Sequence, residues 1–157
     1  MFDEKGGLLR YALFDSSGCA VLNLALQEAV LLGDDVLKPQ ALYIALTRVA
    51  DGETMRLFTL LNVASWQLQG QSQTTVFGDF DHADAARLAQ VTGLSQFDFW
   101  PSFRRILELA SEIAQYDQGR IGERHLFYGL LVSRTAAEWL RKVGVDEEQI
   151  LERVIWD

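Results

Sequence analysis

Apolar residues recur three or four positions apart in two well separated stretches of the chain. That spacing places them on one face of an α-helix, which has about 3.6 residues per turn. Each stretch is therefore predicted to form an amphipathic helix whose apolar stripe faces a core. The stripes consist of Leu22, Ala25, Ala29 and Leu32 in the first stretch and of Ile106, Leu109, Ile113 and Tyr116 in the second.

Glycines and polar residues divide the rest of the chain into short segments. Gly33, Gly119 and Gly144 stand where helices are expected to end, because glycine adopts the left-handed conformation of a helix C-terminus at little cost. Only 74–77 has the composition of a strand, so no sheet is predicted. The pattern predicts an all-α fold, with an extra helical turn near 8–13 and helices over about 16–32, 39–50, 53–61, 64–69, 101–117, 122–133, 135–143 and 146–155.

The chain also contains an internal repeat. Residues 14–29 align without a gap with residues 99–114, and a phenylalanine, a serine, two leucines and two alanines coincide. After a slip of one residue, 37–46 align with 121–130, and 58–63 then align with 140–145. The sequence thus predicts a single domain over 1–157, built from two tandem four-helix repeats, about 14–69 and 99–155, with pseudo-twofold symmetry. A long, partly helical connection over 70–98 joins them.

Charge and cysteine content narrow the function classes. The formal net charge is −8, and the arginines of the second half alternate with glutamates, so a nucleic-acid partner is not expected. Cys19 is the single cysteine, which excludes an intrachain disulfide and suits a reducing compartment. No signal sequence or apolar run of about 20 residues is present, so membrane insertion is not expected and a cytoplasmic location is.

Sequence motifs for catalysis are missing. The chain has no phosphate-binding loop, no nucleophile elbow, no zinc-protease motif and no pair of cysteines, so we expect no enzyme activity, no cofactor and no ATP. The acidic cluster from Asp79 to Asp84 is interpreted as capping a helix rather than as a weak cation site or the acidic site of an enzyme. His125 is expected to have a packing or capping role.

Aromatic residues crowd the connection between the repeats. They are expected to cover the joint between the two repeats, because a long connection needs apolar anchors. An exposed aromatic patch that binds a partner is the alternative. The residues are Phe77, Phe80, Phe97, Phe99 and Trp100.

Three blocks of the second repeat resemble a known family. Residues Phe99 to Ala110, Ile121 to Leu131 and Val143 to Asp146 are similar, in order and spacing, to the repeat of the N-terminal domain of Clp/Hsp100 unfoldases. The resemblance implies a non-catalytic protein- or peptide-binding domain, acting as an adaptor or regulator of a Clp-type AAA+ unfoldase or binding its clients. There are two alternatives, both of which would use the groove between the repeats. One is sequestration of a small ligand or peptide, and the other is recruitment to a secretion assembly.

The resemblance also implies a place for the binding site. Some members of that family hold phosphorylated arginine on a glutamate of each repeat, but the matching positions here are Gln40 and Arg124, and Glu123 lies one residue away. Phosphoarginine binding is therefore expected to be lost, because an arginine repels a guanidinium. The candidate partner-binding residues are Phe14, Asp15, Gln40, Phe99, Trp100 and Arg124.

Overall fold

The computed structural model describes residues 1–2, 4, 9–34, 36–49, 52, 54–56, 99–117, 119–132 and 141. These residues form helices and isolated backbone bridges, with no longer strand among them, which confirms the all-α fold. The connection 70–98, the helices predicted over 64–69 and 146–155 and most of that over 135–143 lie outside the described residues. The division into two repeats of four helices each therefore stays a prediction.

The helices begin and end close to the predicted positions. The short 3-10 helix η1 spans Tyr11–Leu13, and α1 spans Ser16–Leu31. Helix α2 spans Pro39–Arg48, and the residues described from the next predicted helix, 54–56, are helical. In the second half, α6 spans Pro101–Tyr116 and α7 spans Glu123–Leu131.

The ends of α1 show why its bounds could be predicted. At its start, the Asp15 side chain accepts a hydrogen bond from the Gly18 backbone N–H at 2.8 Å. At its end, Gly33 has a φ of 73°, and its N–H bonds the carbonyl of Val30. The N–H of Asp34 bonds Ala29, so the two bonds form a Schellman motif around the predicted glycine.

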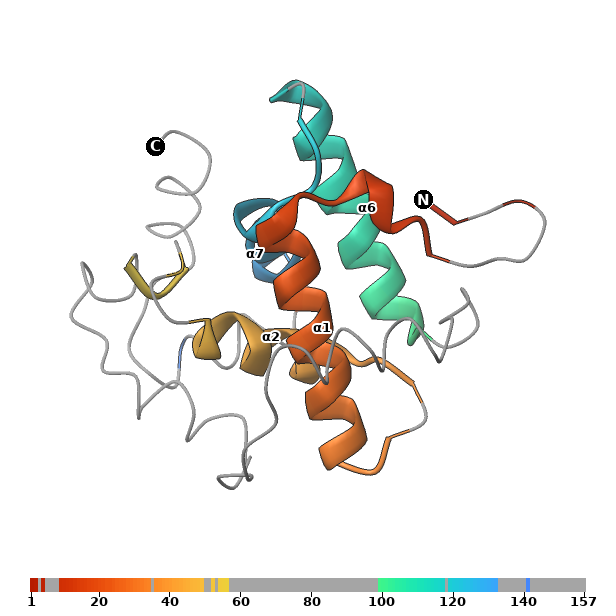
Figure 1. Ribbon diagram of the computed structural model, residues 1–157, viewed down its shortest axis with the longest axis vertical. Helices are drawn as coiled ribbons and strands as arrows, with labels where there is room; N and C mark the ends of the chain where they lie inside the picture. Colours follow the sequence, from red (N-terminus) through yellow and green to blue (C-terminus); the bar gives the residue numbers. More distant parts are fainter. Residues whose placement is uncertain are drawn as a thin grey trace.

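The internal repeat is visible in the described helices. Helix α6 begins and ends 85 residues after α1, as the starts Ser16 and Pro101 and the ends Leu31 and Tyr116 show. Helix α7 begins 84 residues after α2, which is the predicted slip of one residue. Within each copy the two helices pack on each other, α1 against α2 and α6 against α7 (Figure 1).

Two backbone bridges join the copies, and they pair equivalent positions in a reciprocal way. Phe14 pairs with Ile121, and Leu37 pairs with Phe99, both in parallel orientation. In the repeat alignment Phe14 corresponds to Phe99 and Leu37 to Ile121, so each bridge is the counterpart of the other. A contact in which i meets j and j meets i is the signature of a twofold relation. The described halves are therefore related by pseudo-twofold symmetry.

Both apolar stripes were predicted correctly only in part. Leu22, Ala25 and Ala29 are buried in α1, whereas Leu32 is half-buried and is the residue that follows the helix. In α6 the buried residues are Phe103, Ile106, Leu107, Ala110 and Ala114, whereas Tyr116 is 86% exposed, so its place in the core was predicted wrongly. The buried face of α6 therefore includes Ala110 and Ala114 rather than Tyr116.

Glycine makes one close contact between the repeats possible. A Cβ atom on Gly18 would lie 2.2 Å from the carbonyl oxygen of Ile121. That oxygen accepts the hydrogen bond from Asp15 N–H at 3.0 Å, so it is held in place. The position therefore tolerates only glycine without a shift of the backbone.

We predict that Gly18→Ala destabilises the protein by about 1–3 kcal/mol, because the added methyl group overpacks the contact with Ile121. Helix propensity alone predicts a gain of about 1 kcal/mol, so the sign of the change is informative. Chemical denaturation followed by circular dichroism measures it. Gly119→Ala is the matched control, because its Cβ would have no neighbour nearer than 3.8 Å. A Gly18→Ala protein as stable as the wild type would contradict the close contact.

Candidate functional site

The six candidate residues differ in accessibility. Phe14 and Phe99 are 2% and 3% exposed, so their side chains belong to the core. Asp15, Gln40 and Arg124 are half-buried. Trp100 is 50% exposed, which makes it the accessible aromatic side chain of the set.

In the structure, the candidate residues that lie close together come from different repeats rather than from the same repeat. Asp15 lies at the start of α7, since its Oδ2 is 2.6 Å from the place of a Cβ on Gly122. Trp100 lies at the start of α2, because its N–H donates to the Leu37 carbonyl at 2.8 Å. Asp15 therefore neighbours the helix that carries Arg124, and Trp100 neighbours the helix that carries Gln40.

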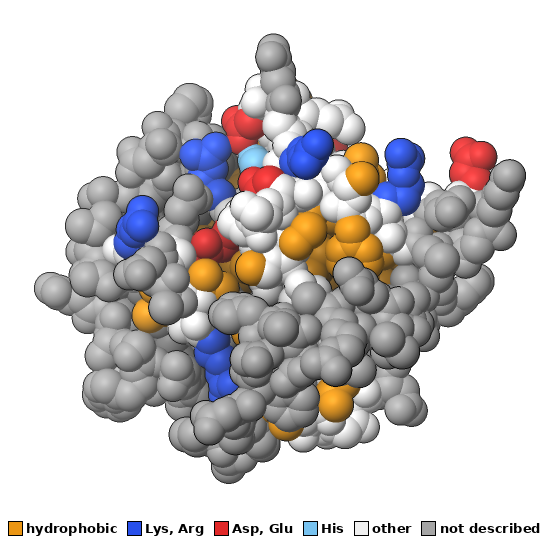
Figure 2. All heavy atoms as spheres, in the orientation of Figure 1, with side chains coloured by type: hydrophobic (Ala, Val, Ile, Leu, Met, Phe, Trp, Pro, Cys, Tyr) orange, Lys and Arg blue, Asp and Glu red, His pale blue; other side chains and the backbone are white. Residues whose placement is uncertain are grey.

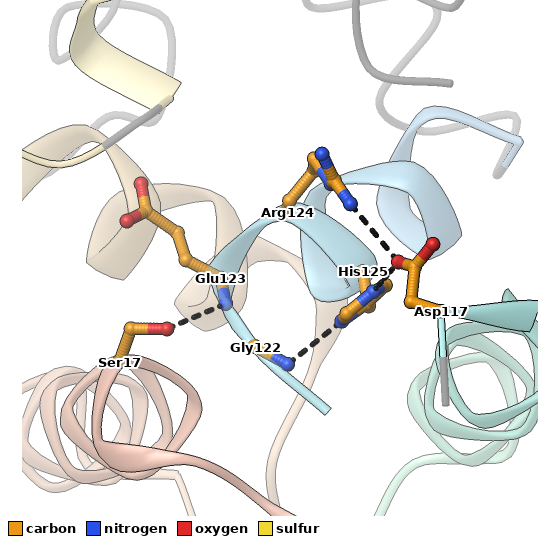
Figure 3. A network of polar contacts seen from close by, with 6 residues as sticks. All are labelled: Ser17, Asp117, Gly122, Glu123, Arg124 and His125. Carbon is orange, nitrogen blue, oxygen red and sulfur yellow. Dashed lines mark hydrogen bonds and ion pairs between the residues drawn. The ribbon is translucent and has the colours of Figure 1, made fainter. Parts of the chain in front are cut away.

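Polar groups around Asp15 satisfy one another. The Asp15 carboxylate accepts hydrogen bonds from the Ser17 hydroxyl at 2.7 Å and from Gly18 N–H at 2.8 Å. The Ser17 hydroxyl in turn accepts a bond from Glu123 N–H at 3.1 Å, across the repeats (Figure 3). Helices α1 and α7 thus have their first turns capped by the same pair of side chains. Sequence reasoning missed Ser17 as a cap for α7, because Ser17 and Glu123 are 106 positions apart.

Glu123 does not offer a free carboxylate near Arg124. Its side chain is buried, and Oε1 accepts a hydrogen bond from Thr54 N–H at 2.8 Å. Figure 3 shows this carboxylate pointing away from Arg124, toward the helical turn of residues 54–56. Glu123 therefore caps a helix of the first repeat from the start of α7, and it does not replace the glutamate that the resemblance implies one position later.

Arg124 and His125 converge on Asp117 at the end of α6 (Figure 3). Arg124 Nη2 lies 2.9 Å from Asp117 Oδ2, and His125 Nε2 lies 2.5 Å from the same oxygen. His125 Nδ1 accepts a bond from Gly122 N–H, so the imidazole proton is on Nε2 and is donated to Asp117. His125 thus caps α7, as predicted. The hydrogen bond from His125, and to a lesser extent the interactions with Arg124, hold the pKa of Asp117 below its usual value against the opposing effect of burial.

The surroundings of Trp100 are open by comparison. Trp100 is the N-cap residue of α6 and makes no side-chain capping bond there. The Lys38 ammonium lies 5.6 Å from the centre of the Trp100 ring, within range of a cation–π interaction, and pairs with Asp34 at 3.3 Å. Sequence reasoning missed Lys38. Lys38 follows Leu37 in the chain, and Leu37 forms the backbone bridge with Phe99, the residue before Trp100. Only this bridge shows that Lys38 and Trp100 are neighbours.

The described residues give little support for a metal site, a membrane span, a reactive thiol or a basic patch. Within them, no three His, Cys, Asp or Glu side chains cluster to hold a metal, and no helix is long and apolar enough to cross a membrane. Burial raises the pKa of the Cys19 thiol, which disfavours the reactive thiolate. On the face in Figure 2 the basic side chains are spread among acidic ones rather than gathered in one patch. The cluster from Asp79 to Asp84 lies outside the described residues.

We predict that Glu123→Ala destabilises the protein by about 1–3 kcal/mol, because it leaves the buried Thr54 N–H without its acceptor. Glu123→Gln keeps an acceptor oxygen and should recover part of the loss. Urea denaturation compares the two variants with Glu112→Ala, an exposed α6 position expected to change stability by less than about 0.5 kcal/mol. Equal effects of the alanine variants at 123 and 112 would contradict the capping role.

We predict that Asp117 stabilises the fold above its ordinary pKa of 3.8 and that this contribution is lost as the pH falls through its lowered value. The sign follows because the unfolded state binds the proton more tightly. The difference in unfolding free energy between wild type and Asp117→Asn should therefore shrink on acidification. Denaturation curves at several pH values measure it. A difference that is independent of pH would show that Asp117 has no charge-dependent role.

Two solved structures share the fold of this chain. The N-terminal domain of Caseinolytic protease associated chaperone ClpD from Arabidopsis thaliana matches with a TM-score of 0.62 and 17% identity, over 94% of this chain and 95% of that chain. A chain from structural investigations of a malarial protein secretion system matches with a TM-score of 0.63 and 21% identity, over 90% and 94% of the two chains. Neither a protein-family model nor a curated protein matches the sequence. The chain has the all-α fold of a Clp N-terminal domain.

Proposed function

We propose that this chain is a non-catalytic protein- or peptide-binding domain that acts with a Clp-type unfoldase, as an adaptor or regulator. Its fold over 94% of the chain is that of the N-terminal domain of a chaperone associated with the caseinolytic protease. The observation that carries the proposal is Trp100, a large aromatic side chain that is half exposed at the junction of the repeats. Exposed tryptophans are costly to leave in water and are enriched among the residues that dominate binding energy.

The backbone around Trp100 is well held, which suits a binding anchor. Phe99 is buried and takes part in a bridge, the Trp100 N–H bonds Leu37, and α6 begins at Pro101. Little backbone freedom remains to be lost when a partner binds, so more of the contact energy appears as affinity. We propose that Phe14 and Phe99 serve the site by positioning their neighbours from the core.

The equivalent place around Asp15 supports a different role. Its carboxylate, Ser17 and the first turn of α7 satisfy one another, and Arg124 is engaged by Asp117. Both acceptors that could attract a guanidinium, Asp15 and Glu123, are already bonded within the protein. This arrangement supports the loss of phosphoarginine binding, and leaves Asp15, Gln40 and Arg124 as secondary contacts to a partner.

Recruitment to a secretion assembly is a second candidate function. A chain from a malarial protein secretion system has the same fold, at a similar TM-score and over a similar share of this chain. Both functions use the domain to bind another protein. They differ in the assembly to which that protein belongs, a protease-associated unfoldase or a secretion apparatus.

We predict that the immobilised protein binds casein, an unfolded model client, and that Trp100→Ala weakens the binding by about 1–3 kcal/mol. Biolayer interferometry measures both affinities. Tyr116→Ala is the matched control, because Tyr116 is an 86% exposed aromatic residue at the other end of α6. Addition of a Clp-type unfoldase ring should give a ternary complex in size-exclusion chromatography.

Two outcomes would count against the proposed function. Absence of binding to both casein and the unfoldase ring would remove the protein-binding role. Binding that is equally weakened by Trp100→Ala and Tyr116→Ala would show that exposed aromatic surface in general, and not a site at Trp100, is responsible. Melting temperatures recorded for each variant separate a loss of binding from a loss of folding.

A further inference from the structure

We infer that the surface around Trp100 binds acidic segments of its partner, in which an aspartate or glutamate stands beside an aromatic or large apolar residue. The surface consists of Trp100, Lys38 and Arg104, and is named here the Trp100 surface. The inference rests on the proposed function and adds to it the chemical class of the partner segment.

One cationic side chain lies near the exposed indole, and a second cationic residue follows one helical turn along α6. Lys38 comes from the start of α2 and lies 5.6 Å from the centre of the Trp100 ring. Arg104 lies on α6, and its backbone N–H bonds the Trp100 carbonyl at 3.0 Å. That bond places the backbone of Arg104 one helical turn beyond Trp100.

Neither cation is held by a strong ion pair among the residues that the structure describes. Arg104 makes no ion pair among the residues that the structure describes, and its Nε is buried without a hydrogen-bond partner. Lys38 pairs with Asp34, but the two side chains are 41% and 23% exposed at i,i+4 spacing, and such pairs are weak. A carboxylate from a partner can therefore replace Asp34 and reach Arg104 at small cost.

The internal repeat shows what the Trp100 surface lacks. Trp100 occupies the position that Asp15 occupies in the first repeat, since each directly precedes the first helix of its copy. At Asp15 the chain supplies its own carboxylate to the meeting point of α1 and α7. At the meeting point of α6 and α2, Trp100 supplies none, and the positive ends of both helices add to the field of Lys38 and Arg104.

Charge complementarity then selects the partner. The protein as a whole carries a formal charge of −8, so it repels acidic chains except where its own surface is locally positive. The indole supplies apolar contact area, while the cations decide orientation and discriminate against basic segments. An acidic segment with an adjacent apolar residue satisfies both requirements at the Trp100 surface, whereas a basic segment meets like charge there.

The test uses three labelled peptides of equal length around one central tryptophan, with flanking aspartates, asparagines or lysines. Fluorescence anisotropy at low ionic strength should give the aspartate peptide an affinity at least about ten-fold higher than the lysine peptide. Lys38→Glu should reduce or reverse that preference, and Arg104→Gln should reduce it. Arg120→Glu is the matched control, since Arg120 is exposed on the α6–α7 loop, outside the Trp100 surface.

The outcomes separate this inference from the proposed function. Equal affinity for the three peptides, a preference for lysine, or the same response to Lys38→Glu and Arg120→Glu would overturn the acidic preference while casein binding at Trp100 still stands. Failure to bind any peptide while casein binds would overturn it as well. Failure to bind both peptides and casein would instead remove the proposed function. Lys38→Glu keeps the test decisive if Arg104→Gln does not fold.

Discussion

The rest of the structure depends on the two reciprocal backbone bridges between the repeats. Backbone groups at the start of a helix have no partner within that helix, and when they are buried they must find one elsewhere. Here the segment before each helix pairs with the segment before a helix of the other repeat, Phe14 with Ile121 and Leu37 with Phe99. All four side chains are nearly inaccessible, so apolar burial and backbone pairing act at the same points. Neither half could complete these contacts alone.

The bridges also set the chemistry of the surface, because they bring the first helix of one repeat to the second helix of the other. One framework therefore carries two equivalent junctions with different side chains. At the first, Asp15, Ser17 and Glu123 bond to one another and to the first turns of three helical segments, which leaves the junction closed. At the second, Trp100 takes the place of the acid, remains half exposed and lies against Lys38. The different side chains at equivalent positions make one junction an internal cap and the other an accessible surface.

The described residues offer rigidly placed side chains rather than reactive groups. The described residues hold one thiol whose pKa is raised by burial and one histidine whose two nitrogens are both engaged in hydrogen bonds. What they present to solvent is an aromatic ring on a well-fixed backbone, with the Lys38 ammonium beside it. That combination supports the proposed recognition of another chain.

Local patterns in the sequence were enough to determine the helices, their order and the repeat. Periodicity and the helix end at Gly33 involve residues near one another in the chain, and both were found where expected. The offset between the described helices of the two copies also agrees with the alignment. The partners across the repeats were decided by the tertiary structure alone. Ser17 and Glu123 are 106 positions apart, and no local preference links Lys38 to Trp100 or turns Tyr116 away from the core. Such pairs depend on how two folded copies dock, and docking is governed by shape and by close approach at residues such as Gly18, which no periodicity records.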